Sequence, residues 1–327
     1  MYSSILQGDR TEMDKDKLTS HHSNAAYTRE SSSTVSSQEN YTGDMVTQPN
    51  KTSHQLQARE IDCANIHEIV LDEKPIGRGT RKLTYLGTTG EGEKIALKVV
   101  DPVANDIQLA QLSLFKEILL LQQLDHPGIL KLKGYCVINN RKPKSDTDPK
   151  KEGIIGVFER AEKFDIKSLS ERKKIQTAFE LADILDYLED SPFGSFLMTD
   201  LRKDNFMFVE GRLKLTDADL LNAPEPECMG KQACVTWDPN ASCRDWGCKL
   251  RVPCFMGQCQ GYNAKLMIRM AHDKFFMELL QCDECPVKIR LEKLSARIPS
   301  LIVSKRGIDE INAKELKKEL QTILANW

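Results

Sequence analysis

Two aspartates and an asparagine in one short stretch carry the side chains with the clearest chemistry. Asp200, Asn205 and Asp217 follow one another in the run TDLRKDNFMFVEGRLKLTDAD. Carboxylate and amide oxygens suit Mg²⁺ and Mn²⁺, and a free carboxylate can orient and deprotonate a hydroxyl. Phosphoryl transfer asks a protein mainly for such positioning and for stabilisation of charge. The stretch therefore predicts a phosphoryl-transfer site in which Asp200 faces the acceptor hydroxyl while Asn205 and Asp217 bind metal.

A β-hairpin is expected to bring these three side chains together. Residues 205–209 and 212–216 are rich in strand formers and alternate in character, and the Glu210-Gly211 dipeptide between them is a turn signal. The hairpin would return the second aspartate to the loop that holds the first. Two aspartates at a hairpin are, by themselves, more often ordinary surface charge, so the interpretation needs further matches.

A glycine loop and a strand lysine precede this stretch. Gly77 and Gly79 lie between two apolar segments, and Lys98 lies within the apolar run 95–100, IALKVV. An unpaired ammonium group is costly to bury in such a strand, so Lys98 needs an acidic partner.

The acidic partner is expected on a helix at 109–124. This run has apolar residues at helical spacing, with the main stripe at Leu112, Phe115 and Leu119. Glu117 lies off that stripe, and we predict an ion pair between Glu117 and Lys98. The helix should stop at Pro127, ahead of an apolar strand at 129–135.

The order of these motifs resembles that of the protein kinases. Glycine loop, strand lysine, helix glutamate, loop aspartate with its asparagine, and a second aspartate follow one another as in that fold, and EILLLQQLDHPGILKLKGYC is similar in character. The cysteine-rich run PCFMGQCQGYNAK at 253–265 resembles the secretory-pathway kinases, the branch that includes vertebrate lonesome kinase. The resemblance extends over roughly 70–280 by motif order.

The resemblance implies an α+β, bilobal protein-kinase-like fold. It implies a small β-rich N-lobe at about 66–160 and a mainly helical C-lobe at about 161–327, joined near Phe158 to Ala161, with a cysteine-rich segment at 228–285. ATP and Mg²⁺ or Mn²⁺ would lie between the lobes.

The resemblance also implies roles for the site residues. Backbone groups of the glycine loop would cover the phosphates, Lys98 held by Glu117 would bind the α and β phosphates, and Arg202 would neutralise the transferred phosphoryl group. The catalytic candidates are Asp200, Lys98, Glu117 and Arg202; the nucleotide-binding candidates are Gly77, Gly79, Lys82, Lys98, Phe158 and Ala161; the metal-binding candidates are Asn205, Asp217 and Asp219.

Several positions depart from the family pattern. Lys82 stands at the third glycine of the loop, where a side chain could touch phosphate. Met198-Thr199 stand where kinases have His-Arg, so no arginine is present there to bind a phosphorylated activation segment. Ala218 and Asp219 replace the usual Phe and Gly, which adds a third carboxylate that either binds metal or faces solvent. No Ala-Pro-Glu segment follows, so the sequence does not predict the substrate platform of ordinary kinases.

Composition favours a globular domain preceded by a tail. The 327 residues are 40% hydrophobic, but residues 1–60 are mostly polar and charged, which predicts a disordered tail and a kinase-like domain at 61–327. The net charge of -2 gives no sign of nucleic-acid binding, and no apolar run is long enough to cross a bilayer. Residues 1–7 lack the basic start and apolar core of a signal peptide. The start therefore lies upstream, or export uses another route, or the protein is cytosolic.

Cysteine usage favours an oxidising compartment. Eight of the ten cysteines follow the hairpin: Cys228, Cys234, Cys243, Cys248, Cys254, Cys259, Cys282 and Cys285. We favour disulfides over structural zinc or free thiols, because the count is even and clustered and only Cys282 and Cys285 have the close spacing of a zinc pair. Cys63 and Cys136 either pair with each other or stay free. Three N-glycosylation sequons, at Asn40, Asn50 and Asn240, are compatible with secretion.

The expected function is an ATP-dependent protein kinase acting on secreted or Golgi- or ER-lumenal proteins, with the preference for tyrosine implied only by the resemblance. A secretory pseudokinase that binds nucleotide and signals by contact is the first alternative, and a cytosolic serine/threonine kinase is the second. Supporting helices are expected at 173–188, at 266–280 and after the capping box at 312–315.

Overall fold

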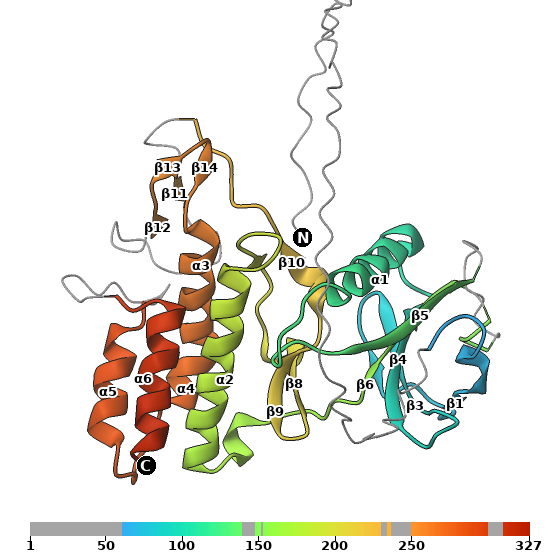
Figure 1. Ribbon diagram of the computed structural model, residues 1–327, viewed down its shortest axis with the longest axis horizontal. Coiled ribbons are helices and arrows are strands. Elements are labelled where there is room, and N and C mark those ends of the chain that lie inside the picture. The colour runs from blue at the N-terminus through green and yellow to red at the C-terminus, as the bar shows by residue number, and fades with distance from the viewer. Residues whose placement is uncertain (1–60, 139–147, 152, 230–233, 237–249, 300–309) are drawn as a thin grey trace, which may run out of the picture. The chain divides into compact units, whose positions relative to one another are not determined.

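An antiparallel sheet forms the first part of the chain in the computed structural model (Figure 1). The structure describes residues 61–138, 148–151, 153–229, 234–236, 250–299 and 310–327. The strand order is β1-β3-β4-β6-β5, with β2 paired to β3. The strands are β1 (Val70–Leu71), β2 (Gly77–Arg78), β3 (Lys82–Thr88), β4 (Lys94–Val100), β5 (Leu132–Ile138) and β6 (Gly153–Glu159).

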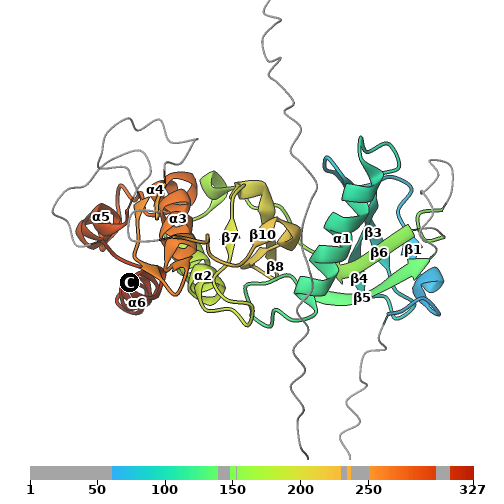
Figure 2. The same ribbon diagram turned by 90° about the horizontal axis from the view of Figure 1, so that it is seen from above.

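Helix α1 (Ile107–Leu121) covers one face of this sheet, as Figure 2 shows from above. It begins where the Asp106 side chain accepts a hydrogen bond from the backbone N of Leu109, which satisfies one of the free amides of the first turn. Strand β4 alternates, with Ile95, Leu97 and Val99 buried on the face away from α1. Its other face therefore turns Lys98 towards the helix.

The predicted apolar stripe of α1 was wrong. Leu112, Phe115 and Leu119 are 65%, 38% and 43% exposed, whereas Glu117 is fully buried. The helix carries apolar residues on several sides, so spacing could not select the buried face. The buried face is the one that turns Glu117 towards Lys98.

Helices make up most of the second part of the chain, where α2, α3, α5 and α6 lie side by side (Figure 1). Their bounds are α2 (Glu171–Glu189), α3 (Tyr262–Ala271), α4 (Met277–Leu279), α5 (Lys288–Arg297) and α6 (Ala313–Ala325). A π-helical turn, His272–Phe276, joins α3 to α4. The short strand pairs are β7 (Leu197–Met198) with β10 (Leu221–Asn222), β8 (Phe206–Val209) with β9 (Arg212–Leu215), β11 (Val235–Thr236) with β12 (Leu250–Arg251), and β13 (Cys254–Phe255) with β14 (Gln258–Cys259).

The three predicted helices of this part are confirmed. In α2, Ile175, Ala182, Leu185 and Leu188 lie on one face and are buried in the core, and Phe179 beside them is half-buried. The predicted helix at 266–280 is α3, the π-helical turn and α4 together. In α6, the Asn312 side chain accepts from the backbone N of Glu315 at 2.8 Å, as the capping-box sequence predicts.

A charge cluster joins α2 to α6 and should make the free energy of unfolding depend on pH in the acid range. Asp183 lies 3.3 Å from His126 Nε2 and 2.8 Å from Lys317 Nζ. The hydrogen bond from His126, opposed by partial burial and aided by Lys317, lowers the pKa of Asp183 to about 2. Its stabilising contribution is therefore complete above about pH 4 and is lost as pH falls towards 2.

We expect Asp183→Asn to lower the free energy of unfolding by about 1 kcal/mol at pH 7, since solvent screens part of the interaction. The difference between wild type and variant should shrink as pH falls below 4. Urea unfolding at pH 7 and at pH 3 measures both values. A difference that stays constant with pH would contradict the assignment to the Asp183 charge.

Four disulfides join the cysteines of the described residues: Cys63–Cys136, Cys228–Cys254, Cys234–Cys259 and Cys282–Cys285. The disulfide interpretation is thus confirmed for these eight, including the open pairing of Cys63 with Cys136. Cys243 and Cys248, the three sequons and the tail predicted at 1–60 lie outside the described residues. No helix within the described ranges is long and apolar enough to cross a membrane.

Candidate active site

The loop that carries Asp200 is bonded to the predicted hairpin. Asn205 Nδ2 donates to the backbone oxygen of Asp200 at 2.8 Å. Thr216 donates to the backbone oxygen of Asn205 from its N at 2.8 Å and from Oγ1 at 3.1 Å. These bonds hold the start of β8 and the end of β9 together, so that Asp217 lies beside the loop, as the hairpin pattern predicted.

The hairpin turn itself follows from two residues. Glu210 and Gly211 have φ values of 51° and 77°, the left-handed conformation that a two-residue hairpin turn of type I′ requires at both positions. Strand β8 pairs with β9 from Phe206–Leu215 to Val209–Arg212. The turn and register therefore set where Asp217 leaves the hairpin.

Helix α3 holds the other end of the loop. The buried Asn263 side chain donates from Nδ2 to the backbone oxygen of Ser195 at 2.7 Å. The Met267 sulfur lies 3.2 Å from the backbone N of Met198, which is the last residue of β7. Asn263 gives no sequence signal of this role, because a single asparagine at a helix start is common.

Lys98 and Glu117 form the predicted ion pair. Lys98 Nζ lies 2.5 Å from Glu117 Oε1 and also donates to the backbone oxygen of Thr216 at 2.7 Å. The ammonium lies 5.0 Å from the ring centroid of Phe158, which is fully buried. One lysine thus connects strand β4, helix α1 and the hairpin.

Lys82 lies in the same cluster, which its position in the glycine loop did not predict. Its Nζ is 2.8 Å from Glu117 Oε2, 2.6 Å from Asp217 Oδ1 and 2.9 Å from Asp219 Oδ1. Burial alone would lower the pKa of Lys82, but these three carboxylates outweigh burial and raise that pKa. Lys82 is therefore a protonated ammonium held among carboxylates.

Asp219 does not face solvent, so that alternative was wrong. Its side chain is 6% exposed and accepts hydrogen bonds from Lys82 and from the hydroxyl of Ser113 on α1. Lys116, also on α1, donates to the Asp219 backbone oxygen at 2.8 Å. Burial raises the pKa of Asp219. The charge of Lys82 opposes this rise, and the charges of Asp217 and Glu117 add to it, so that the pKa lies above its ordinary value. These contacts fasten α1 to the segment after β9.

Sequence reasoning missed Ser113, Lys116 and Thr216. Ser113 lies one turn before Glu117 on the same helix, so a helical projection centred on Glu117 would have placed it nearby, whereas Lys116 directly precedes Glu117 and projects to a neighbouring side of the helix. Thr216 precedes Asp217 directly, but its role depends on backbone and hydroxyl hydrogen bonds that carry no sequence pattern.

The oxygen donors of the cluster fit Mg²⁺ or Mn²⁺. One oxygen from each of Glu117, Asp217 and Asp219 lies within 4.8 Å of the others. Burial would raise the pKa of Asp217, but Lys98 and Lys82 lower it to about 2, so its carboxylate is ionised at neutral pH. Because Asn205 uses Nδ2 as a donor to Asp200, its Oδ1 is the atom left for a cation. Hard cations of this kind prefer such oxygen ligands.

Asp200 and Arg202 are open to solvent. Arg202 Nε lies 3.2 Å from Asp200 Oδ2, and their side chains are 59% and 53% exposed. An exposed pair of this kind is weak and easily exchanged for other partners. The Asp200 carboxylate is therefore accessible to an incoming hydroxyl group.

The other nucleotide-binding candidates lie on the sheet and at its end. Gly77 on β2 pairs with Thr84, and Gly79 N donates to the Lys82 oxygen at 2.9 Å, so both glycines lie in the exposed β2–β3 hairpin. Phe158 is near the end of β6. Ala161 lies half-buried in the connection from β6 to α2, next to the bridge between Glu162 and Phe208 of β8.

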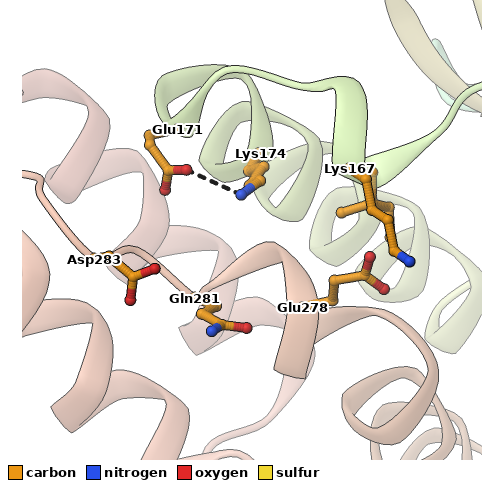
Figure 3. A pocket seen from close by; sticks show the side chains of 7 residues that line it. Lys167, Glu171, Lys174, Glu278, Gln281 and Asp283 are labelled. Atoms are coloured by element: carbon orange, nitrogen blue, oxygen red, sulfur yellow. Dashed lines mark hydrogen bonds and ion pairs between the residues drawn. The ribbon is translucent and has the colours of Figure 1, made fainter.

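A separate cavity of about 450 Å³ lies at the start of α2 (Figure 3). Its lining is mixed in charge: Ile166, Lys167, Glu171, Lys174, Glu278, Gln281 and Asp283. Lys203, from the Asp200 loop, pairs with Glu278. That ion pair connects the wall of the cavity to the loop.

Residues 70–239 match the family described as protein tyrosine and serine/threonine kinase. The chain belongs to this family. The sheet with α1 is thus the N-lobe of a protein kinase and the helical part its C-lobe, so the predicted α+β, bilobal fold with its cysteine-rich insert is confirmed.

The chain is also similar to a human protein named extracellular tyrosine-protein kinase PKDCC. The two are 29% identical over 235 residues, an alignment that covers 67% of this chain and 45% of the human protein. The chain therefore spans about half the length of that relative. The predicted resemblance to the secretory-pathway branch is confirmed by this similarity.

Proposed function

We propose that this kinase transfers the γ-phosphate of ATP to hydroxyl groups of proteins, and to tyrosine in secreted or lumenal proteins. A linked set of hydrogen bonds carries the proposal. Lys98 Nζ donates to Glu117 at 2.5 Å and to the backbone oxygen of Thr216, and the Thr216 hydroxyl donates to the backbone oxygen of Asn205. A fold kept only for binding other proteins would have no chemical reason to keep this network complete.

In the proposed reaction, Asp200 orients the acceptor hydroxyl and takes its proton. Its exposed carboxylate supports this role, since a base must reach the substrate. Lys98, positioned by Glu117, binds the α and β phosphates, while backbone groups at Gly77 and Gly79 cover them. Arg202 leaves Asp200 to neutralise the transferred phosphoryl group.

The proposed ligands of Mg²⁺ or Mn²⁺ are Asn205, Asp217 and Asp219. A bound ion would supply positive charge that offsets the negative charge of the phosphates. The Asn205 amide is oriented by its bond to Asp200, which leaves Oδ1 as the donor. Asp219 is held by Ser113, so of the three it is the residue that must share its oxygens with α1.

Phe158 and Ala161 are proposed to line the nucleotide site where the lobes join. The buried Phe158 ring lies beneath Lys98, and Ala161 follows the end of β6. We further propose the bounds 61–327 for the catalytic unit, with an N-lobe at about 66–160, a C-lobe at about 161–327 and the cysteine-rich segment at 228–285. A tail at 1–60 would precede them.

Secretion or residence in the Golgi or ER lumen is proposed from the cysteines. Four disulfides among the described residues need an oxidising compartment to form and persist. The human relative is named as extracellular, and the preference for tyrosine is proposed from its name alone.

A pseudokinase is the second candidate function, and one observation favours it. Lys82 lies on the same carboxylates that would hold metal. If that ammonium never left them, the protein would keep the fold and signal only by contact.

Transfer of labelled γ-phosphate tests the proposal. Residues 60–327, or the whole chain, are expressed through a secretory host and incubated with labelled ATP and Mg²⁺ or Mn²⁺, alone and with mixed peptides. We expect label on tyrosine, seen after acid hydrolysis and separation of phosphoamino acids. Label on serine or threonine would refute the tyrosine preference, and absence of transfer by folded, nucleotide-binding protein would support the pseudokinase.

A further inference from the structure

Lys82 lies at a place in the cluster that a divalent cation would also require. Its ammonium is within 2.9 Å of three carboxylate oxygens, one each from Glu117, Asp217 and Asp219, and its side chain is 12% exposed. Among the described residues, Glu117, Asp217 and Asp219 form the one carboxylate group close enough together to bind a single ion. A side-chain cation therefore occupies the protein's own candidate metal cluster.

The two lysines of the cluster divide Glu117 between them. Lys98 takes Oε1 at 2.5 Å, whereas Lys82 takes Oε2 at 2.8 Å. Lys98 is 3.8 Å from Asp217, while Lys82 is 2.6 Å from it. Lys82 is thus the nearer cation to Asp217, and Lys98 holds a separate oxygen of Glu117 that does not involve Lys82.

A metal ion and the Lys82 ammonium compete for the same atoms. Mg²⁺ binds carboxylate oxygens at about 2.0–2.1 Å and needs them free of a second cation. Asp217 Oδ1 and Asp219 Oδ1 are both engaged by Lys82 Nζ. Repulsion between two cations at such short range makes simultaneous occupation unfavourable.

Lys82 lies next to the glycine loop, so a displaced ammonium would stay close to the groups that this loop covers. Lys82 is the first residue of β3, directly after the glycine-loop hairpin, where its backbone oxygen accepts from Gly79 N. Its four-carbon stem is flexible, so the ammonium can turn from the carboxylates towards groups covered by that loop. Phosphate oxygens are the anions expected there.

We propose that Lys82 is a tethered cation that holds the Glu117–Asp217–Asp219 cluster while nucleotide is absent and moves to the phosphates when metal and ATP enter together. This inference rests on the proposed function for its nucleotide site. As a consequence, the nucleotide-free kinase binds divalent metal poorly, and metal binding depends on an anion that attracts Lys82 away from the carboxylates.

Binding of Mn²⁺ without nucleotide tests the inference. Free Mn²⁺ is followed by electron paramagnetic resonance during titration of the full chain, its disulfides intact, for wild type and Lys82→Met. We expect the variant to bind Mn²⁺ at least tenfold more tightly. Lys116→Met is the matched control, because it removes a nearby ammonium that contacts the Asp219 backbone oxygen and Asn222 without touching a carboxylate.

Three results would overturn the inference. They are unchanged Mn²⁺ affinity in Lys82→Met, weaker affinity there, or an equal gain in Lys116→Met, which would indicate general electrostatics. If loss of the buried ammonium prevents Lys82→Met from folding, the charge-balanced pair decides: Lys82→Met/Asp219→Asn must bind Mn²⁺ more tightly than Asp219→Asn alone. Unchanged affinity between these two would also refute it.

The metal titration does not depend on phosphoryl transfer. If the protein phosphorylates tyrosine but its Mn²⁺ affinity is the same in wild type and Lys82→Met, the tethered cation is refuted and the proposed function is supported. If the protein transfers no phosphate but Lys82→Met binds Mn²⁺ more tightly than wild type, the proposed function is refuted and the tethered cation is supported.

Discussion

Asp200→Asn is expected to lower kcat for γ-phosphate transfer by about 10³-fold, within the range that a general base contributes. Asparagine keeps the size and one acceptor of the side chain but cannot take the hydroxyl proton. The fold should not change, because the Asp200 side chain is 53% exposed and the contact that positions Asn205 uses the backbone oxygen of Asp200. Initial rates on peptide, nucleotide affinity and Tm separate these effects.

Asp204→Asn is the matched control for that variant. Asp204 lies in the 3₁₀ turn of the same loop and is exposed, so the substitution makes the same change of charge four residues away. We expect its kcat to stay within about threefold of wild type, since it removes neither the base nor a metal ligand. If Asp200→Asn retained more than a tenth of wild-type kcat, Asp200 would not be the base.

Removal of the Cys63–Cys136 disulfide is expected to cost about 4 kcal/mol of unfolding free energy, because its sequence separation of 73 residues closes a long loop. The loop contains β1 to β4, α1 and part of β5, which is most of the N-lobe sheet. The double variant Cys63→Ala/Cys136→Ala avoids leaving a reactive thiol or burying a new hydroxyl at Cys136, which is 1% exposed. Urea unfolding of both proteins under non-reducing conditions measures the difference.

The Cys282–Cys285 disulfide provides the control, since its sequence separation is 3 residues. On the same chain-entropy argument, Cys282→Ala/Cys285→Ala should cost about half as much, roughly 2 kcal/mol. Equal losses in the two double variants would show that loop closure does not determine the contribution. A smaller loss for the Cys63 pair would show that the sheet holds the N-terminal segment without it.

The sequence predicted those parts of the site that depend on local pattern. The hairpin after Asn205 follows from alternation on both sides of Glu210-Gly211, whose left-handed φ values match the turn signal. The capping box at Asn312 follows from hydrogen bonds within four residues. Such patterns can be read from a sequence because the atoms that interact are neighbours in the chain.

The pairing of Lys98 with Glu117 was also predictable, because a lysine in an apolar strand must find an acid. That argument placed the pair correctly but not the helix face, since Leu112 and Leu119 proved exposed. The helix is apolar on several sides, and hydrophobic spacing alone does not distinguish between nearly equal faces.

By itself, the sequence determined the order of the kinase motifs, the strand lysine and its acid, the hairpin and the supporting helices. Only the tertiary structure decided that Lys82 forms an ion pair with Asp217 and that Asp219 accepts a hydrogen bond from Ser113. These contacts join residues 106 to 135 positions apart. The choice between solvent, metal, phosphate and another side chain depends on how the sheet, α1 and the hairpin meet, and no local spacing in the chain records that geometry.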